Sequence, residues 1–286
     1  MKKYIALAVI ALCAAVYFNI SKTTEKPTKV KTFRIGVECD YAPNNWEEKK
    51  PSDFNAPVSN HEGYYADGYD IQIAKLAANH LGAELIVRKI KWEDLIPALQ
   101  NGEIDAIFSG MLDTEERHKQ IAFTNTYEVK ETEYVVVVNT DSLYADAEKL
   151  TDFTGAKFLC QKDTNLYASI AQIPGAVALP AVETVPEMLR NLTSGKADAT
   201  VINLDTGHSY EATYSNLKVI RFPENEGFNV GFHGICAGVR KKDTDLLNQI
   251  NIMLKQLPQS ERQKIMDSTI SRLWKDLSSR IHKNLS

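Results

Sequence analysis

The chain has 286 residues, of which 44% are hydrophobic and 24% are charged, a composition typical of globular proteins and long enough for two domains. The formal net charge is −4 and the isoelectric point is about 5.9. The lysines and arginines form no basic patch along the sequence, which argues against a nucleic-acid-binding protein.

The N-terminal segment differs from the rest of the chain. "MKK" precedes an uncharged apolar run from Tyr4 to Ile20, which predicts a signal sequence or a membrane anchor in residues 1–20. Cys13 raises the alternative of lipid attachment, although Leu12 stands where lipoprotein signals have a small residue. An uncleaved anchor stays open because the run is close to the length that spans a bilayer. Residues 21–31 predict a polar tether, and we expect export to the periplasm or the outer face of the cell membrane.

The cysteines and histidines give no sign of a disulfide framework or a metal site. Cys39, Cys160 and Cys236 follow the leader at wide spacing, and we expect them to be buried apolar residues. The six histidines form no HxxxH or HExxH pair. We therefore expect neither a metal nor another cofactor.

Strands alternate with helices in the first half of the folded part. Residues 33–38 predict a strand, residues 70–81 a helix that ends at Gly82, and residues 84–90 a second strand. "WEDLIPALQNG" predicts a helix that ends at Gly102, and "IDAIFS" a third strand. This alternation is typical of parallel βαβ units.

The stretch from Ser109 to Tyr127 places an arginine where a helix does not favour it. Thr114 predicts the N-cap of a short helix, and Arg117 falls in the first turn, where a cation opposes the helix dipole. One interpretation is an exposed arginine paired with Asp113 or Glu116. The other is an arginine that binds an anion from outside the chain, because its planar fork suits carboxylates.

The same pattern restarts in the second half. "DFTGAKFLCQ" predicts a turn and a strand, "ETVPEML" a helix with Thr184 and Glu187 at capping-box spacing, and "ADATVIN" the next strand. "LQNGEIDA" (99–106) and "LTSGKADA" (192–199) both read L-x-x-G-x-x-D-A. Coincidence in a common turn is one explanation, and two similarly built lobes are the other. The helical segment 245–274 is expected to cover a surface, with Leu246, Ile250, Met253 and Leu257 as its apolar stripe.

Loops that follow parallel strands are the expected place for a ligand. This rule selects residues 38–41 and 109–110 in the first half, and residues 161–165 and 203–205 in the second half. If the two lobes face each other, these loops share one cleft. "TEYVVVVN" and "NVGFHGICAGVR" are the two extended crossings between the lobes and predict a hinge.

With these residues in place, the chain resembles the extracytoplasmic solute-binding proteins of the polar amino-acid family, which serve ABC importers. "RIGVECDYAPNNW", "GYDIQIAKLAANHLGAEL", "WEDLIPALQNGEIDAIFSGM" and "TEERHKQIAFTNTY" carry the resemblance, which runs from about Phe33 to Trp274. It implies an α/β fold of the type II periplasmic-binding-protein class, with two lobes, each a mostly parallel sheet flanked by helices, joined by a two-segment hinge. We expect lobe 1 at 32–134 plus 235–286 and lobe 2 at 135–234. It also implies a membrane permease as partner, and a monomer.

The resemblance further implies a ligand site. Arg117 matches the arginine that clamps the ligand α-carboxylate, Tyr41 and Trp92 match pocket walls, Glu38 matches an acid that contacts the ligand side chain, and Thr164 matches a threonine that bonds the carboxylate. The implied ligand-binding residues are Glu38, Tyr41, Trp92, Ser109, Gly110, Leu112, Arg117, Thr164, Asn203 and Asp205.

Several positions depart from the family. Leu112 stands where Ser or Thr is usual, and Asp163 replaces a usual glycine. Asn203 stands where an acid usually receives the ligand α-ammonium, and Asp205 or Asp163 is the candidate to compensate. A modified amino acid, a small peptide or an amino-free carboxylate therefore stays open beside an ordinary amino acid.

Two other functions stay open. An anchored sensor would report a ligand to a membrane partner. A dehydratase on the same fold would use Glu38 or Asp205 as a general acid, but the sequence holds no nucleophile–base pair, metal motif or phosphate loop. We therefore expect a binding protein and no enzyme.

Overall fold

The structure is a computed structural model that describes residues 31–127, 133–223, 225–230 and 234–284, with side chains up to residue 273. The predicted leader, Cys13, all of the predicted tether except Lys31 and part of each predicted crossing lie outside these residues. Thr32–Ser286 form one compact unit, which is described here by itself. Within the described ranges, no helix is both long enough and apolar enough to cross a membrane.

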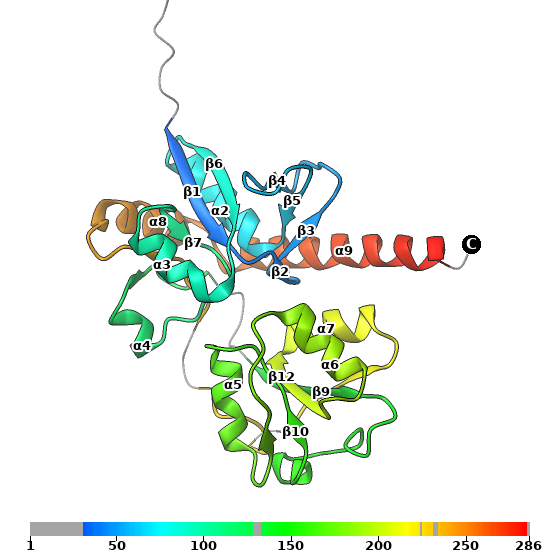
Figure 1. Cartoon of the computed structure of the whole chain (residues 1–286). Helices are drawn as coiled ribbons and strands as arrows, with labels where there is room; N and C mark the ends of the chain where they lie inside the picture. Colours follow the sequence, from blue (N-terminus) through cyan, green and yellow to red (C-terminus); the bar gives the residue numbers. More distant parts are fainter. Residues whose placement is uncertain (1–30, 128–132, 224, 231–233, 285–286) are drawn as a thin grey trace, which may run out of the picture. The chain divides into compact units, whose positions relative to one another are not determined.

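The first lobe is built on a mixed five-stranded sheet in the order β6-β1-β7-β14-β8. Strands β6, β1 and β7 of this sheet are labelled in Figure 1. Strand β1 runs parallel to β6 and β7, whereas β14 is antiparallel to β7 and β8. Phe33, Ile35 and Val37 of β1 are buried in the core of this lobe. The strands are β1 (Thr32–Val37), β6 (Glu84–Lys89), β7 (Ala106–Ile107), β8 (Ala122–Phe123) and β14 (Gly238–Val239).

The second lobe repeats this plan with the order β11-β10-β12-β9-β13. Strand β10 is parallel to β11 and β12, whereas β9 is antiparallel to β12 and β13. The two-lobed α/β prediction is confirmed. Each sheet is mixed, because β14 and β8 in the first lobe and β9 and β13 in the second lobe pair antiparallel with their neighbours. The strands are β9 (Tyr134–Asn139), β10 (Lys157–Phe158), β11 (Val177–Ala178), β12 (Ala199–Asn203) and β13 (Leu217–Ile220).

The L-x-x-G-x-x-D-A motif has the same structural place in both lobes. The Asp105 carboxylate accepts the backbone N–H of Arg34 in β1 at 3.0 Å, and the Asp198 carboxylate accepts that of Lys157 in β10 at 2.8 Å. In both lobes the alanine after this aspartate pairs in parallel with the neighbouring strand. The repeat therefore reflects equivalent local structure.

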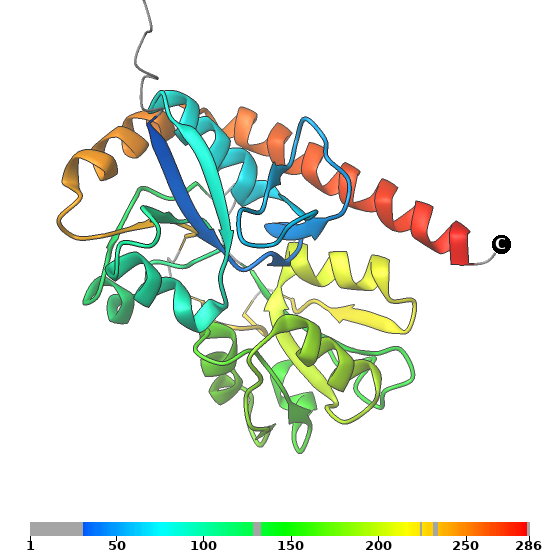
Figure 2. The same cartoon turned by 45° about the horizontal axis from the view of Figure 1, so that its top comes forward.

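Helices flank both sheets. The two C-terminal helices, α8 in orange and α9 in red, pack against α2 of the first lobe (Figure 2). Ile250 and Met253 of α8 are buried, and Leu246 and Leu257 are half-buried against the same core, as the apolar stripe predicted. The helices are α2 (Tyr69–His80), η1 (Trp92–Asp94), α3 (Leu95–Gln100), α4 (Glu115–His118), η2 (Leu150–Phe153), α5 (Asn165–Ser169), η3 (Ile170–Gln172), α6 (Val185–Thr193), α7 (Leu204–Thr213), α8 (Thr244–Gln256) and α9 (Gln259–Asn284).

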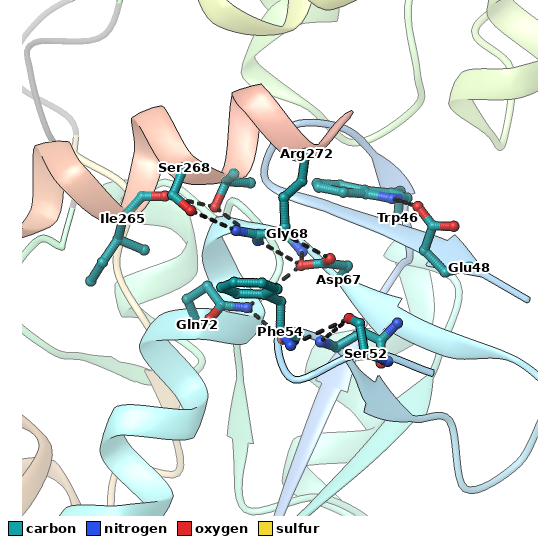
Figure 3. Close-up of polar contacts among 12 residues, drawn as sticks. Trp46, Glu48, Ser52, Phe54, Asp67, Gly68, Gln72, Ile265, Ser268 and Arg272 are labelled. Carbon is teal, nitrogen blue, oxygen red and sulfur yellow. Dashed lines mark hydrogen bonds and ion pairs between the residues drawn. The ribbon is translucent and has the colours of Figure 1, made fainter. Parts of the chain in front are cut away.

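A small antiparallel sheet between β1 and α2 was not predicted. It has the order β2-β3-β5-β4, with strands β2 (Asp40–Tyr41), β3 (Asn45–Glu48), β4 (Ala56–Pro57) and β5 (Tyr65–Asp67). Asp67 at its end pairs with Arg272 of α9 at 2.9 Å, and the Phe54 ring lies 4.1 Å from the same guanidinium (Figure 3). This contact ties the C-terminal helix to the small sheet. Cys39, Cys160 and Cys236 are buried free cysteines, as expected.

Candidate functional site

One cavity lies where the strand-end loops of the two lobes meet. It encloses about 440 Å³, its open mouth included. Nine of the ten predicted ligand-binding residues line it, whereas Asp205 is not among its described lining residues. The lining residues are Glu38, Tyr41, Trp92, Ser109, Gly110, Leu112, Arg117, Tyr134, Gln161, Thr164, Asn165, Leu166 and Asn203.

A buried carboxylate holds the first-lobe loops in place. Asp70, in the first turn of α2, accepts hydrogen bonds from the Asn45 amide at 2.8 Å and the Tyr127 hydroxyl at 2.6 Å. Asn45 in turn accepts the backbone N–H of Cys39 at 2.8 Å, and Gly110 donates its backbone N–H to Asp70. Burial raises the pKa of Asp70 to about 6 against these hydrogen bonds. Asp70 therefore positions both loops that bring the first lobe to the cavity.

Gly110 brings the backbone close to an aromatic wall. Its φ of +62° is left-handed, and a Cβ there would lie 3.0 Å from the Tyr41 ring. Tyr41 packs in turn against the second-lobe apolar cluster that includes Val135 and Leu159. The loop after the third predicted strand therefore needs a glycine to accommodate this ring.

Arg117 is a buried cation that has no carboxylate partner among the described residues. Its side chain donates to the Leu112 carbonyl at 2.9 Å and to the Asp163 carbonyl at 3.2 Å. The guanidinium also lies 5.0 Å from the centre of the Trp92 ring. Burial lowers the pKa of Arg117 to about 10, and electrostatic interactions with Tyr134 and Asp163 oppose this only in part.

The interpretation of Arg117 as an exposed, paired arginine is wrong. Only 9% of the residue is exposed. Asp113 lies 3.8 Å from His118, and Glu116 lies 2.8 Å from Lys119, so both carboxylates face other partners. The N-cap prediction is confirmed, because the Thr114 hydroxyl accepts the backbone N–H of Arg117 at 3.3 Å. The short helix α4 therefore presents Arg117 inward.

Glu38 is the acidic group of the cavity. It follows β1 directly and is 4% exposed, and its backbone N–H donates to the Ser109 hydroxyl at 3.0 Å. One carboxylate oxygen accepts a short hydrogen bond from the Gln161 amide of the second lobe. Burial raises the pKa of Glu38 to about 7, and the Gln161 hydrogen bond opposes this rise. The group is therefore poised between its neutral and charged forms near neutral pH.

The second lobe contributes neutral polar groups. The Thr164 hydroxyl donates to the Gln161 carbonyl at 2.7 Å and accepts the backbone N–H of Tyr167 at 3.2 Å as the N-cap of α5. Its one donor is therefore used within the protein. Asn203 is the N-cap residue of α7, but its side chain does not cap the helix. Its amide makes no hydrogen bond to another described residue.

Trp92 and Arg117 also connect the lobes. Both donate to the backbone carbonyl of Asp163, each at 3.2 Å. Asp163 itself adopts a left-handed φ of 58°, which a usual glycine would adopt without strain. The departure from the family at this position therefore falls in a loop that touches the first lobe.

Some lining residues were not singled out from the sequence. Gln161 and Asn165 lie in a loop that the strand-end rule selected, but Tyr134 and Leu166 do not. Tyr134 opens the antiparallel strand β9, and the rule applies only to the carboxyl ends of parallel strands. Within the described ranges, no group of three His, Cys, Asp or Glu residues has the arrangement of a metal site. The arrangement suits the capture of a small ligand with a carboxylate and a hydrogen-bonding body.

Comparisons with known proteins show which proteins this chain is similar to. The family model for bacterial extracellular solute-binding proteins, family 3, matches residues 33–270. The arginine-binding extracellular protein ArtP of Bacillus subtilis is 24% identical over 265 residues, covering 90% of this chain and 93% of that protein. The glutamine-binding protein of Geobacillus stearothermophilus is 30% identical over 215 residues, covering 69% and 79%.

A solved structure shares this fold. The crystal structure of the substrate-binding protein of an amino acid ABC transporter has a TM-score of 0.69 and 27% identity, and the match covers 83% of this chain and 98% of that one. The chain is thus similar along most of its length to proteins of known fold.

Proposed function

Because the chain belongs to the bacterial extracellular solute-binding proteins of family 3, we propose that it binds an amino acid or a related small carboxylate or zwitterion and delivers it to an ABC importer. The observation that carries the proposal is Arg117. A guanidinium that is 9% exposed and has only carbonyl oxygens as partners among the described residues lacks a counterion. Burial of such a charge is costly unless a bound anion compensates it.

The ligand carboxylate docks on Arg117 through the N–H groups that do not already donate to carbonyls. A guanidinium has five N–H donors, and only two donate within the described residues. Tyr41 and Trp92 form the walls, Gly110 and Leu112 supply backbone close to the carboxylate, and Glu38 and Ser109 also line the cavity. The second lobe closes with Thr164 and Asn203, and the exclusion of water strengthens each polar contact. Asp205 is not among the described lining residues of the cavity, so the proposal gives it no direct contact with the ligand.

The proposed transport role includes a membrane partner and export from the cytoplasm. The closed form presents both lobes to a membrane permease, and the protein acts as an extracytoplasmic monomer exported through its N-terminal segment. Lobe 1 is proposed at 32–134 plus 235–286 and lobe 2 at 135–234, with the hinge between them. A permease that reads the closed form would respond only to the loaded protein.

A dehydratase is the second candidate function, and one observation favours it. Glu38 is a buried acid whose pKa is raised to about 7, which suits a general acid. Incubation with a cyclohexadienyl acid, followed by product detection, tests this function. We expect no turnover, because the described lining residues include no second carboxylate and no histidine to act as a base beside this acid.

Calorimetric titration of the chain from Ser21 with the common amino acids, their desamino analogues and short peptides tests the binding function. A ligand at 100 times its Kd should also stabilise the fold by about 2.7 kcal/mol in thermal unfolding. The function predicts at least one ligand with a carboxylate that binds the native protein but not the Arg117→Ala variant. Binding of none of these compounds to a folded protein would overturn it.

A further inference from the structure

The charges that line the cavity are few. Among its described lining residues, only Arg117 and Glu38 have acidic or basic side chains that can carry a charge near neutral pH. Asp163 contacts the site through its backbone carbonyl, and its side chain is not part of the lining. The cavity therefore offers one cation and one acid to whatever it binds.

Glu38 lacks a cation of its own. One oxygen accepts the Gln161 amide, and the other has no hydrogen-bond partner among the described residues. The charged groups that act on it are Asp40 of β2, Lys89 of β6 and Glu93 of η1. Lys89 is already engaged, 2.8 Å from Glu47 and 3.5 Å from Asp40. The neighbouring charges therefore leave the Glu38 carboxylate uncompensated.

Asn203 is the polar group on the opposite lobe. It follows β12 at the carboxyl end of that strand, and its amide is neither a helix cap nor a donor to another described residue. An amide oxygen accepts hydrogen bonds but brings no charge. A cation placed against it would lose its hydration without gaining a counterion.

We propose that the cavity selects a ligand with one carboxylate, held by Arg117, and one cationic group, held by the free oxygen of Glu38, and that neutral hydrogen-bonding atoms of the ligand meet Asn203. This inference rests on the proposed function, because it specifies the ligand class of the same site. A ligand of this kind is net neutral. A free amino acid with two cationic groups, such as arginine, leaves one of them without a carboxylate, although ArtP is named for arginine binding.

A series of arginine-like probes isolates the number of charges from the shape of the ligand. Citrulline keeps the α-ammonium and loses the side-chain charge, Nα-acetyl-arginine does the opposite, arginine keeps both, and agmatine lacks the carboxylate. Calorimetric titration of the chain from Ser21 should show citrulline or Nα-acetyl-arginine binding at least tenfold tighter than arginine, and no binding of agmatine. Whichever of citrulline and Nα-acetyl-arginine binds more tightly shows whether the α-ammonium or the side-chain guanidinium of the ligand contacts Glu38.

Two variants test the assigned partners. Asn203→Asp supplies a second carboxylate and should strengthen arginine binding at least tenfold while citrulline gains less. Glu38→Gln keeps the shape and removes the charge, and it should weaken the better net-neutral probe at least tenfold. Thermal unfolding of each variant serves as the folding control.

The proton balance gives an independent readout. A cation on Glu38 lowers its pKa, so binding near pH 7 should release a proton, and affinity should rise from pH 6 to pH 8. Calorimetric titrations in two buffers of different ionisation enthalpy measure the number of protons released on binding. The Glu38→Gln substitution should abolish this release. If arginine binds tightest and Asn203→Asp changes nothing, the inference is overturned while the amino-acid function stands. If the folded protein binds no probe and no common amino acid, the proposed function itself fails.

Discussion

Two arginines of the first lobe have opposite surroundings. Both lie against an aromatic ring, Arg272 at 4.1 Å from Phe54 and Arg117 at 5.0 Å from Trp92. Arg272 also makes two hydrogen bonds to the Asp67 carboxylate, at 2.9 and 3.3 Å (Figure 3). Arg117 finds only backbone carbonyls among its described partners.

The difference separates a structural arginine from a binding arginine. A charge paired within the chain stabilises the fold, and removing either partner leaves the other uncompensated. A buried charge without a counterion costs stability in the free protein, and a bound anion recovers that free energy. The burial that lowers the pKa of Arg117 to about 10 is the same cost expressed as proton affinity.

The largest expected effect is on ligand binding by Arg117→Ala. The ligand carboxylate loses its buried partner, and we expect the binding free energy to weaken by about 3–5 kcal/mol. The free energy of unfolding should stay constant or rise, because an uncompensated cation is removed. Calorimetric titration and urea unfolding measure the two quantities. An unchanged Kd in a folded variant would remove Arg117 from the site.

Glu38 extends the comparison to acids, because it lacks the cation that Asp67 has. Its raised pKa means that the folded state binds the proton more tightly than the unfolded state. The contribution of Glu38 to the free energy of unfolding is therefore fully present below about pH 4.5 and is lost as the pH rises to about 7. The loss attributable to this group is about 3 kcal/mol. Urea unfolding should show a flatter profile for Glu38→Gln from about pH 4.5 to 7. The difference is clearest between pH 6 and 7, because Asp70, whose pKa is about 6, titrates lower. An identical profile in the variant would contradict the raised pKa.

Arg272→Ala should do the reverse of Arg117→Ala. The pair with Asp67 is largely buried, with 19% and 5% of the side chains exposed, so we expect a loss of about 2 kcal/mol in the free energy of unfolding. Ligand affinity should not change, because none of these residues lines the cavity. A variant that binds more weakly without being less stable would erase the distinction between the two arginines.

The smallest effects concern the two rings. Trp92→Ala should weaken ligand binding by about 1 kcal/mol and leave stability nearly constant, whereas Phe54→Ala should lower stability by less than about 1 kcal/mol and leave binding constant. Titration and unfolding of both variants test this matched pair. Equal effects of the two substitutions on ligand binding would show that each ring does not share the role of the arginine it contacts.

Local signals in the sequence predicted much of the frame. The cap at Thr114 is confirmed, and Thr184 accepts the backbone N–H of Glu187 as its spacing predicted. The strand-end rule selected the loops that line the cavity, because the direction of parallel strands follows from their connections. The repeated motif predicted the correspondence between the lobes, since Asp105 and Asp198 make the same backbone contact.

Long-range contacts could not be predicted in the same way. The strands of the small sheet have two to four residues, too few for a period to appear. The sequence predicts a helix over residues 70–81, which places Asp70 at its start. The role of Asp70 depends on Asn45 and Tyr127, which are 25 and 57 positions away. The burial of Arg117 likewise depends on Asp163, 46 positions further along the chain.

The shared carbonyl of Asp163 has a kinetic consequence. Trp92 and Arg117 of the first lobe both donate to it from across the cavity, and these bonds are formed by the protein itself. A ligand held on Arg117 leaves only after the lobes separate and these bonds break. We therefore expect lobe opening to limit the dissociation rate of every ligand. Ligands of different affinity would then differ mainly in association rate, in contrast to the usual case in which the dissociation rate carries the difference. Stopped-flow dissociation rates that scale with Kd across several ligands would show instead that the ligand contacts set the residence time.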